Sequence, residues 1–212
     1  MIKCFDYQTE RSFKEIEIRP SSIEGAVFLT DIDHCLLDWL SSFEDYVERN
    51  YHTKRSRIPP RYEYNLGYWL NPDDENEGHE FIRGFQTSEE AHNLPAFSDA
   101  LEYVPKIAGL GFNFVAVSSS GYLEGIPKAR RSCLEKNFPG VFSSMFLLEP
   151  GSSKKHVLAM FPPSYWVDDH EVHAQAGRDC GHTSFCMDRT PGLNFCDWGT
   201  VYEKINETGE TI

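Results

Sequence analysis

The sequence lacks any apolar run approaching the roughly 20 residues that a membrane-spanning helix needs. Its first ten residues, MIKCFDYQTE, contain no apolar stretch of the kind found in secretory signal peptides. It also lacks a Cys-x-x-Cys pair, and its six cysteines are irregularly spaced. These absences predict a soluble, cytoplasmic protein with reduced thiols and no membrane partner. A zinc site is disfavoured because the spacing of its four potential ligands matches no common zinc motif: Cys180, His182, Cys186 and Cys196.

Basic residues are comparatively few. The chain carries 20 lysines and arginines against 33 acidic residues, a formal net charge of −13, and no stripe of basic side chains offsets this locally. Such a charge repels polyanions, which argues against duplex nucleic acid as a partner. A small phosphorylated substrate is still compatible, because a metal ion and one or two lysines can make the inside of a single pocket positive.

Apolar runs that each end in polar residues recur along the 212 residues. Runs of this kind are typical of strands buried on both faces of a sheet. Helical patterns separate them at Pro127 to Asn137 and Lys154 to Phe161. The alternation predicts the α/β class, with a doubly wound parallel sheet. The predicted strands are Ala26–Thr30, Phe112–Val117, Met145–Leu148 and Tyr165–Val167.

Residues 36–94 interrupt this alternation. Helical patterns at Leu37 to Tyr51 and around Glu77 to Phe85 follow one another there without an intervening strand. We therefore expect residues 1–35 and 95–212 to form the core domain and residues 36–94 to form a small helical cap inserted into it. The chain is long enough for one core with such an insertion. The sequence does not specify the oligomeric state and is compatible with a dimer.

Polar side chains follow three of the predicted strands. Asp31 and Asp33 follow the first, Ser118 and Ser119 the second, and the pair Asp168–Asp169 the last. Ligands of an open parallel sheet bind beyond the carboxyl ends of its strands, so these side chains should converge on one site. A cluster of carboxylates is costly unless a cation neutralises it. Oxygen ligands suit Mg²⁺, which we expect to be held by Asp31, Asp33, Asp168 and Asp169.

The same residues predict phosphoryl transfer. Asp31 is placed to attack phosphorus and form an aspartyl phosphate, which water then hydrolyses. Asp33 can protonate the leaving oxygen and later deprotonate the water, as a general acid and base. Negative charge on the phosphate oxygens needs donors, for which we predict Ser118, Ser119 and a lysine. Lys155, or its neighbour Lys154, is the predicted lysine.

Taken singly, each of these motifs is weak evidence. An Asp-x-Asp sequence is usually a turn or a solvated loop, a serine-rich segment is usually a loop, and Asp-Asp after a strand is often a helix cap. Their joint occurrence, each after its own apolar strand and with a lysine opening a helix between them, favours a catalytic site.

At this point the sequence resembles the phosphatases of the haloacid dehalogenase (HAD) superfamily. Their four motifs match here as VFLTDIDHCL, FVAVSSSG, the lysine of GSSKKHVL, and YWVDDH. The resemblance implies a Rossmann-like core with a cap inserted after the first motif, Asp31 as nucleophile and Asp33 as acid and base. It also implies Mg²⁺ bound by Asp31, the carbonyl of Asp33 and either Asp168 or Asp169. His34 departs from the pattern, since the family usually has glycine at this turn.

Within the superfamily, the chain looks most like the 5′(3′)-deoxyribonucleotidases. These have a helical cap after the first motif and an aromatic residue eight positions past the nucleophile, here Trp39. The segment NLGYWL resembles their aromatic pair, here Tyr68 and Trp69, which would stack on a base. The alternative is that these three aromatic residues form the core of the cap. The resemblance implies a nucleoside monophosphate as substrate.

Two other functions fit the sequence. The first is a phosphatase of the same superfamily acting on another small phosphate ester or on a terminal phosphate of a nucleic acid. The second is a binding protein that keeps the fold without catalysis, for which His34 is the one hint. The joint presence of Asp31, Asp33, Lys155 and Asp168 argues against the second.

Overall fold

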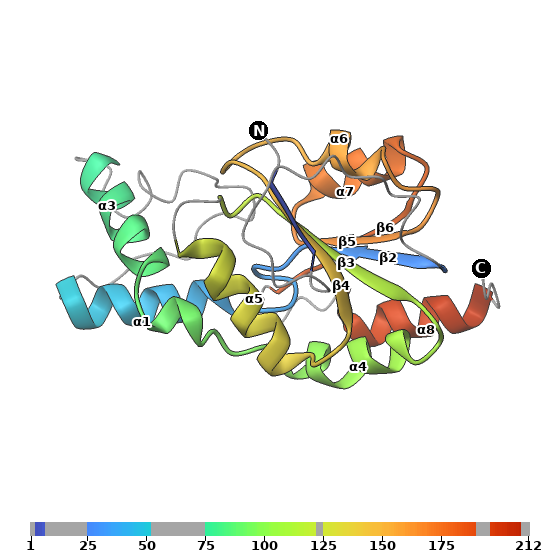
Figure 1. Cartoon of the computed structure of the whole chain (residues 1–212), viewed down its shortest axis with the longest axis horizontal. Coiled ribbons are helices and arrows are strands. Elements are labelled where there is room, and N and C mark those ends of the chain that lie inside the picture. Colours follow the sequence, from blue (N-terminus) through green and yellow to red (C-terminus); the bar gives the residue numbers. More distant parts are fainter. Residues whose placement is uncertain (1–2, 7–24, 52–74, 122–124, 190–195, 209–212) are drawn as a thin grey trace.

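The computed structural model describes residues 3–6, 25–51, 75–121, 125–189 and 196–208, and its centre is a six-stranded sheet (Figure 1). The strand order is β1-β4-β3-β2-β5-β6. Five strands run parallel, and β1 is antiparallel to its neighbour β4. This confirms the predicted α/β class and parallel sheet. The strands are β1 (Lys3–Asp6), β2 (Val27–Thr30), β3 (Asn113–Ser118), β4 (Phe142–Leu147), β5 (Tyr165–Asp168) and β6 (Thr183–Cys186).

Helices cover both faces of the sheet, with α6 and α7 on one side and α4, α5 and α8 on the other (Figure 1). The apolar side chains of β2, β3, β4 and β5 alternate between these two layers. Phe28, for example, belongs to the core cluster on the α4 and α8 side, whereas Leu29 belongs to the cluster on the α6 and α7 side. The core helices are α4 (Ser98–Ala108), α5 (Ile126–Asn137), α6 (Lys155–Leu158), α7 (Glu171–Asp179) and α8 (Trp198–Thr208).

Among the described residues, three helices lie between β2 and α4: α1 (Trp39–Tyr51), α3 (Glu75–Gln86) and the 3₁₀ helix η2 (Glu90–His92). The segments that lead into and out of this region run side by side. The Asp38 amide donates to the Pro95 carbonyl at 2.9 Å, and the Phe97 amide donates to the Leu36 carbonyl at 3.0 Å. The chain thus leaves the core and returns at one place, which suits an insertion. The domain boundaries at residues 36 and 94 stay a prediction.

Helix α4 includes Pro105. A proline inside a helix removes one hydrogen bond, here the one to the carbonyl of Leu101. The helix nevertheless continues past the proline to Ala108. In the part of the chain that the structure describes, no helix has both the length and the apolar character needed to cross a bilayer.

Candidate active site

A buried lysine bridges two aspartates at the carboxyl ends of adjacent strands. The Lys154 ammonium lies 2.8 Å from Oδ2 of Asp31 and 2.6 Å from Oδ2 of Asp168. Asp31 follows β2 and Asp168 ends β5, and these strands pair directly. Backbone amides bind the other oxygens: Ile32 donates to Oδ1 of Asp31, and His170 donates to Oδ1 of Asp168. Burial lowers the pKa of Lys154, but the two carboxylates outweigh it and raise that pKa, so the lysine is a cation.

The structure corrects the sequence-based choice of Lys155 for the phosphate-binding lysine. The Lys155 side chain is exposed and pairs with Asp179 at 2.9 Å, away from the strand ends. Lys154, the open alternative, occupies the expected position. Helix geometry supplies the reason: Lys154 lies three and four residues before the buried Val157 and Leu158, so it shares their face, whereas Lys155 is turned by about 100°.

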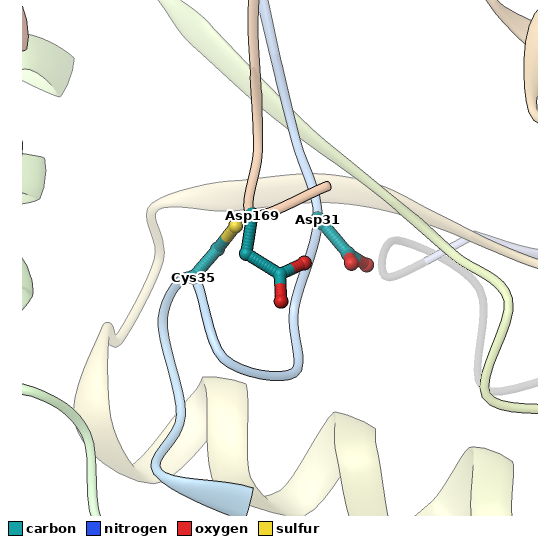
Figure 2. A group of neighbouring side chains, drawn as sticks. All are labelled: Asp31, Cys35 and Asp169. Atoms are coloured by element: carbon teal, nitrogen blue, oxygen red, sulfur yellow. The ribbon is translucent and has the colours of Figure 1, made fainter. Parts of the chain in front are cut away.

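Asp169 completes an acidic cluster beside this bridge. Ligand atoms of Asp31, Asp169 and the buried Cys35 all lie within 4.8 Å of one another. Figure 2 shows the two carboxyl groups on the same side of the strand ends, with the Cys35 sulfur next to Asp169. Burial, and then repulsion from Asp168 and Asp31, raise the pKa of Asp169 well above its usual value. Two neighbouring carboxyl groups fit a hard divalent cation, while the thiol suits Mg²⁺ less well.

Asp33 is held by an arginine that the sequence reasoning missed. Nε of Arg130 lies 2.8 Å from Oδ1 and 3.0 Å from Oδ2 of Asp33, and the contact to Oδ2 has hydrogen-bond geometry. Burial raises the pKa of Asp33, Arg130 opposes this shift, and Asp31 adds to it. A signal for Arg130 was available, since it lies four residues after Ile126 and four before Leu134, on the apolar face of α5.

The two predicted phosphate-binding serines lie at the end of β3, the other neighbour of β2. Ser118 is buried, and its carbonyl accepts from the Leu148 amide. The Ser119 hydroxyl donates to the Ser152 carbonyl at 3.1 Å, which ties this loop to the loop before Lys154. Ser118 is therefore the better placed of the two for a phosphate, because the hydroxyl of Ser119 is already used.

His34 adopts a left-handed backbone conformation, with φ of 63°, in the turn after Asp33. Glycine is the residue that adopts this conformation at least cost. The turn is closed by the His34 amide, which donates to the Leu37 carbonyl at 2.8 Å. The departure noted in the sequence thus changes the side chain while the turn keeps the backbone that a glycine would favour.

Of the three predicted base-stacking residues, the structure describes one. Trp39 is 8% exposed and stacks on Phe43 at 4.7 Å between ring centroids, with the edge of Phe85 5.3 Å away. It therefore lies in the aromatic core of the inserted region, as the alternative interpretation expected. Tyr68 and Trp69 lie outside the described residues.

The disfavoured zinc site does not form among the described residues. Both ring nitrogens of His182 contact backbone groups, the amide of Ser164 and the carbonyl of Leu158. The thiol of Cys180 donates to the carbonyl of Lys155.

Comparisons with known proteins bear on the fold of the chain. No family model matches the chain. Over 164 residues it is 28% identical to an uncharacterised 32.4 kDa protein of Enterobacteria phage T4, a match that covers 74% of this chain and 56% of the phage protein. The chain thus spans little more than half the length of this relative.

Solved structures give a broader match. A proposed β-phosphoglucomutase from Thermotoga maritima superposes with a TM-score of 0.57 at 12% identity, covering 86% of this chain and 99% of that one. The proposed HAD hydrolase YfnB from Bacillus subtilis, solved with bound magnesium, superposes with a TM-score of 0.57 at 14% identity. This match covers 86% of this chain and 99% of that one. A HAD-superfamily hydrolase from Ehrlichia chaffeensis superposes with a TM-score of 0.55 at 16% identity, and the match covers 88% of this chain and 98% of that one. The chain has the fold of the HAD-superfamily hydrolases.

Proposed function

We propose that this protein is a magnesium-dependent phosphatase that forms an aspartyl phosphate on Asp31. The main support is the contact of Lys154 with both Asp31 and Asp168, next to Asp169, where three parallel strands end. A buried cation beside a carboxylate nucleophile is an arrangement that stabilises charge on a transferring phosphoryl group. The fold shared with HAD hydrolases supports the same chemistry.

The residues divide the reaction between them. An oxygen of Asp31 bonds to phosphorus as the ester P–O bond breaks, and Asp33 gives its proton to the leaving oxygen. Water then attacks the phosphorus of the aspartyl phosphate, Asp33 takes a proton from it, and inorganic phosphate and free Asp31 result. Lys154 binds a phosphate oxygen in both steps, and Ser118 lies at the neighbouring strand end to help.

The proposed metal ligands are Asp31, Asp169 and the Asp33 carbonyl, with Asp168 occupied by Lys154. When bound, Mg²⁺ supplies positive charge that neutralises the carboxylates and polarises the phosphoryl group.

A nucleoside monophosphate is the narrower proposal for the substrate. It rests on the deoxyribonucleotidase-like cap and on Tyr68 and Trp69. The burial of Trp39 among Phe43 and Phe85 removes one of the three proposed stacking residues and favours the alternative, another small phosphate ester or a terminal nucleic-acid phosphate. A panel of these substrates separates the two.

The test is phosphate release with and without Mg²⁺ from nucleoside monophosphates and simple esters, comparing the native chain, Asp31→Asn and Asp38→Asn. The last is a matched control on the same loop, because Asp38 accepts from the Ser41 amide and asparagine can do the same. We expect magnesium-dependent release that Asp31→Asn abolishes and Asp38→Asn retains. Full activity of Asp31→Asn would overturn the mechanism, and a complete absence of release would favour the binding-protein alternative.

A further inference from the structure

The guanidinium of Arg130 is buried inside the core, with the residue only 1% exposed, and its described partner is Asp33. The two residues are 97 positions apart, on α5 and on the turn after β2. The contact therefore joins the loop of the proposed acid and base to a helix that lies on one face of the sheet.

Packing alone does not account for an arginine at this position. Its neighbours on the buried face of α5 are apolar or small: Ile126, Ala129, Cys133 and Leu134. Removing a guanidinium from water costs several kcal/mol, and well-packed apolar side chains often replace a buried ion pair without loss of stability. Nη2 of Arg130 is also buried and has no hydrogen-bond partner among the described residues, which adds to the cost. The compensating contact is the one with Asp33.

We propose that Arg130 is a positioning residue that fixes the orientation of the Asp33 carboxyl group for proton transfer. This inference rests on the proposed function. The proton moves from the Asp33 carboxyl group to the leaving ester oxygen in the first step, and from water to the same carboxylate in the second. Arg130 exchanges no proton, since its guanidinium is always charged.

The geometry explains why a fixed orientation matters. Asp33 lies in a turn, its side chain is part-buried, and the described hydrogen bond of its carboxyl group is the one from Arg130. A general acid must lie within hydrogen-bond reach of the oxygen that it protonates, and misplacement by an ångström costs orders of magnitude in rate. The planar guanidinium restricts the carboxyl group more than a lysine ammonium would.

A positioning role and a purely structural role predict different substrate dependence. An arginine that only ties α5 to the loop would, when removed, slow all substrates alike. An arginine that acts through the general acid matters most when the leaving oxygen is strongly basic, as in an alkyl phosphate. It matters little for p-nitrophenyl phosphate, whose leaving group departs without a proton. The informative quantity is kcat/KM, which reports the first phosphoryl transfer and excludes the hydrolysis step common to both esters.

The experiment measures kcat/KM on both esters, with Mg²⁺, for the native chain, Arg130→Met, Asp33→Asn and the double variant. We expect Arg130→Met to lower kcat/KM about 10²-fold for the alkyl phosphate and only a few-fold for p-nitrophenyl phosphate. The larger effect is at the lower end of what general acid catalysis contributes. In the Asp33→Asn background the same substitution should cause no further loss, because the group it positions is gone. Arg130→Lys should restore part of the rate.

Arg131→Met is the matched control, because the neighbouring arginine is partly exposed and pairs with Glu135 one turn on. It should match the native chain on both esters. If Arg130→Met does not fold in a thermal melt, Arg130→Lys and the double variant, which removes both buried charges, give the same comparison. Equal losses on the two esters, or a further loss in the Asp33→Asn background, would overturn the inference alone. A native chain that hydrolyses neither ester would overturn the proposed function and this inference with it.

Discussion

Two adjacent lysines differ in burial and in contacts at this site, although they are one position apart. The side chain of Lys154 is 2% exposed and touches two carboxylates, while that of Lys155 is 54% exposed and touches one on the surface. Both open the same short helix, α6, so the pattern of the motif did not separate them. The position of each lysine relative to Val157 and Leu158 does separate them, once the helix is known to begin there.

Substituting each lysine by methionine tests this assignment. Lys154→Met should lower kcat/KM by about 10²- to 10³-fold, as the loss of one charge-stabilising donor does in other enzymes. Lys155→Met should leave it unchanged, since its exposed ion pair with Asp179 lies outside the site and contributes little to stability. Steady-state kinetics on one ester suffices. A large loss in Lys155→Met with full activity in Lys154→Met would reverse the assignment.

Among the elements, the central strands were the most predictable part of the chain. β2 and β5 are fully buried on both faces, so their sequences VFLT and YWVD read as apolar runs. β6 was missed because Thr183–Cys186 lies at the sheet edge with half-buried or exposed residues, and its sequence, TSFC, has no such run. The carboxylates and Ser118 were placed by the strand ends, whereas Arg130 comes from the middle of a helix, where no motif marks it.

Helix α1 supplies the aromatic core of the inserted region and gives a test of the role of Trp39. Trp39→Ala should lower the free energy of unfolding by about 3–5 kcal/mol, because it removes a buried indole. Its effect on KM should be the same for nucleoside monophosphates as for p-nitrophenyl phosphate. Phe43→Ala, four residues on and also buried, is the control with the same expected pattern. A rise in KM confined to nucleotides in Trp39→Ala would instead indicate base stacking.

The acidic cluster at the strand ends adds local repulsion to a molecule that is already negatively charged. The chain has a net charge of −13, and three of its carboxyl groups meet where the central strands end, with Lys154 as the cation that touches two of them. Repulsion between these carboxyl groups should lower the free energy of unfolding, and a bound cation should raise it again.

Thermal melts with and without Mg²⁺ measure how much the cation stabilises the fold, and they need no substrate. We expect Mg²⁺ at millimolar concentration to raise Tm of the native chain by a few degrees. Asp169→Asn should lose this increase in Tm. Without Mg²⁺, Asp169→Asn should melt at or above the native Tm, because it removes a carboxyl group whose pKa burial raises well above its usual value. Asp179→Asn, at an exposed carboxylate paired with Lys155, should keep the increment. An unchanged increment in Asp169→Asn would remove it from the metal site.

The antiparallel strand β1 has a consequence for how copies of this protein behave together. Lys3–Asp6 pairs along β4 from Leu147 to Ser144 and thereby replaces β4 as the edge strand on that side of the sheet. An uncovered edge strand is a template on which another chain can add a strand, and β4 carries the buried Met145, Phe146 and Leu147. The edge strand β1 has four residues against six in β4, so it offers a shorter template to another chain. A change that displaced Lys3–Asp6 would expose the longer edge of β4, and its first effect would be a loss of solubility, with the contacts of Lys154 at the strand ends still intact.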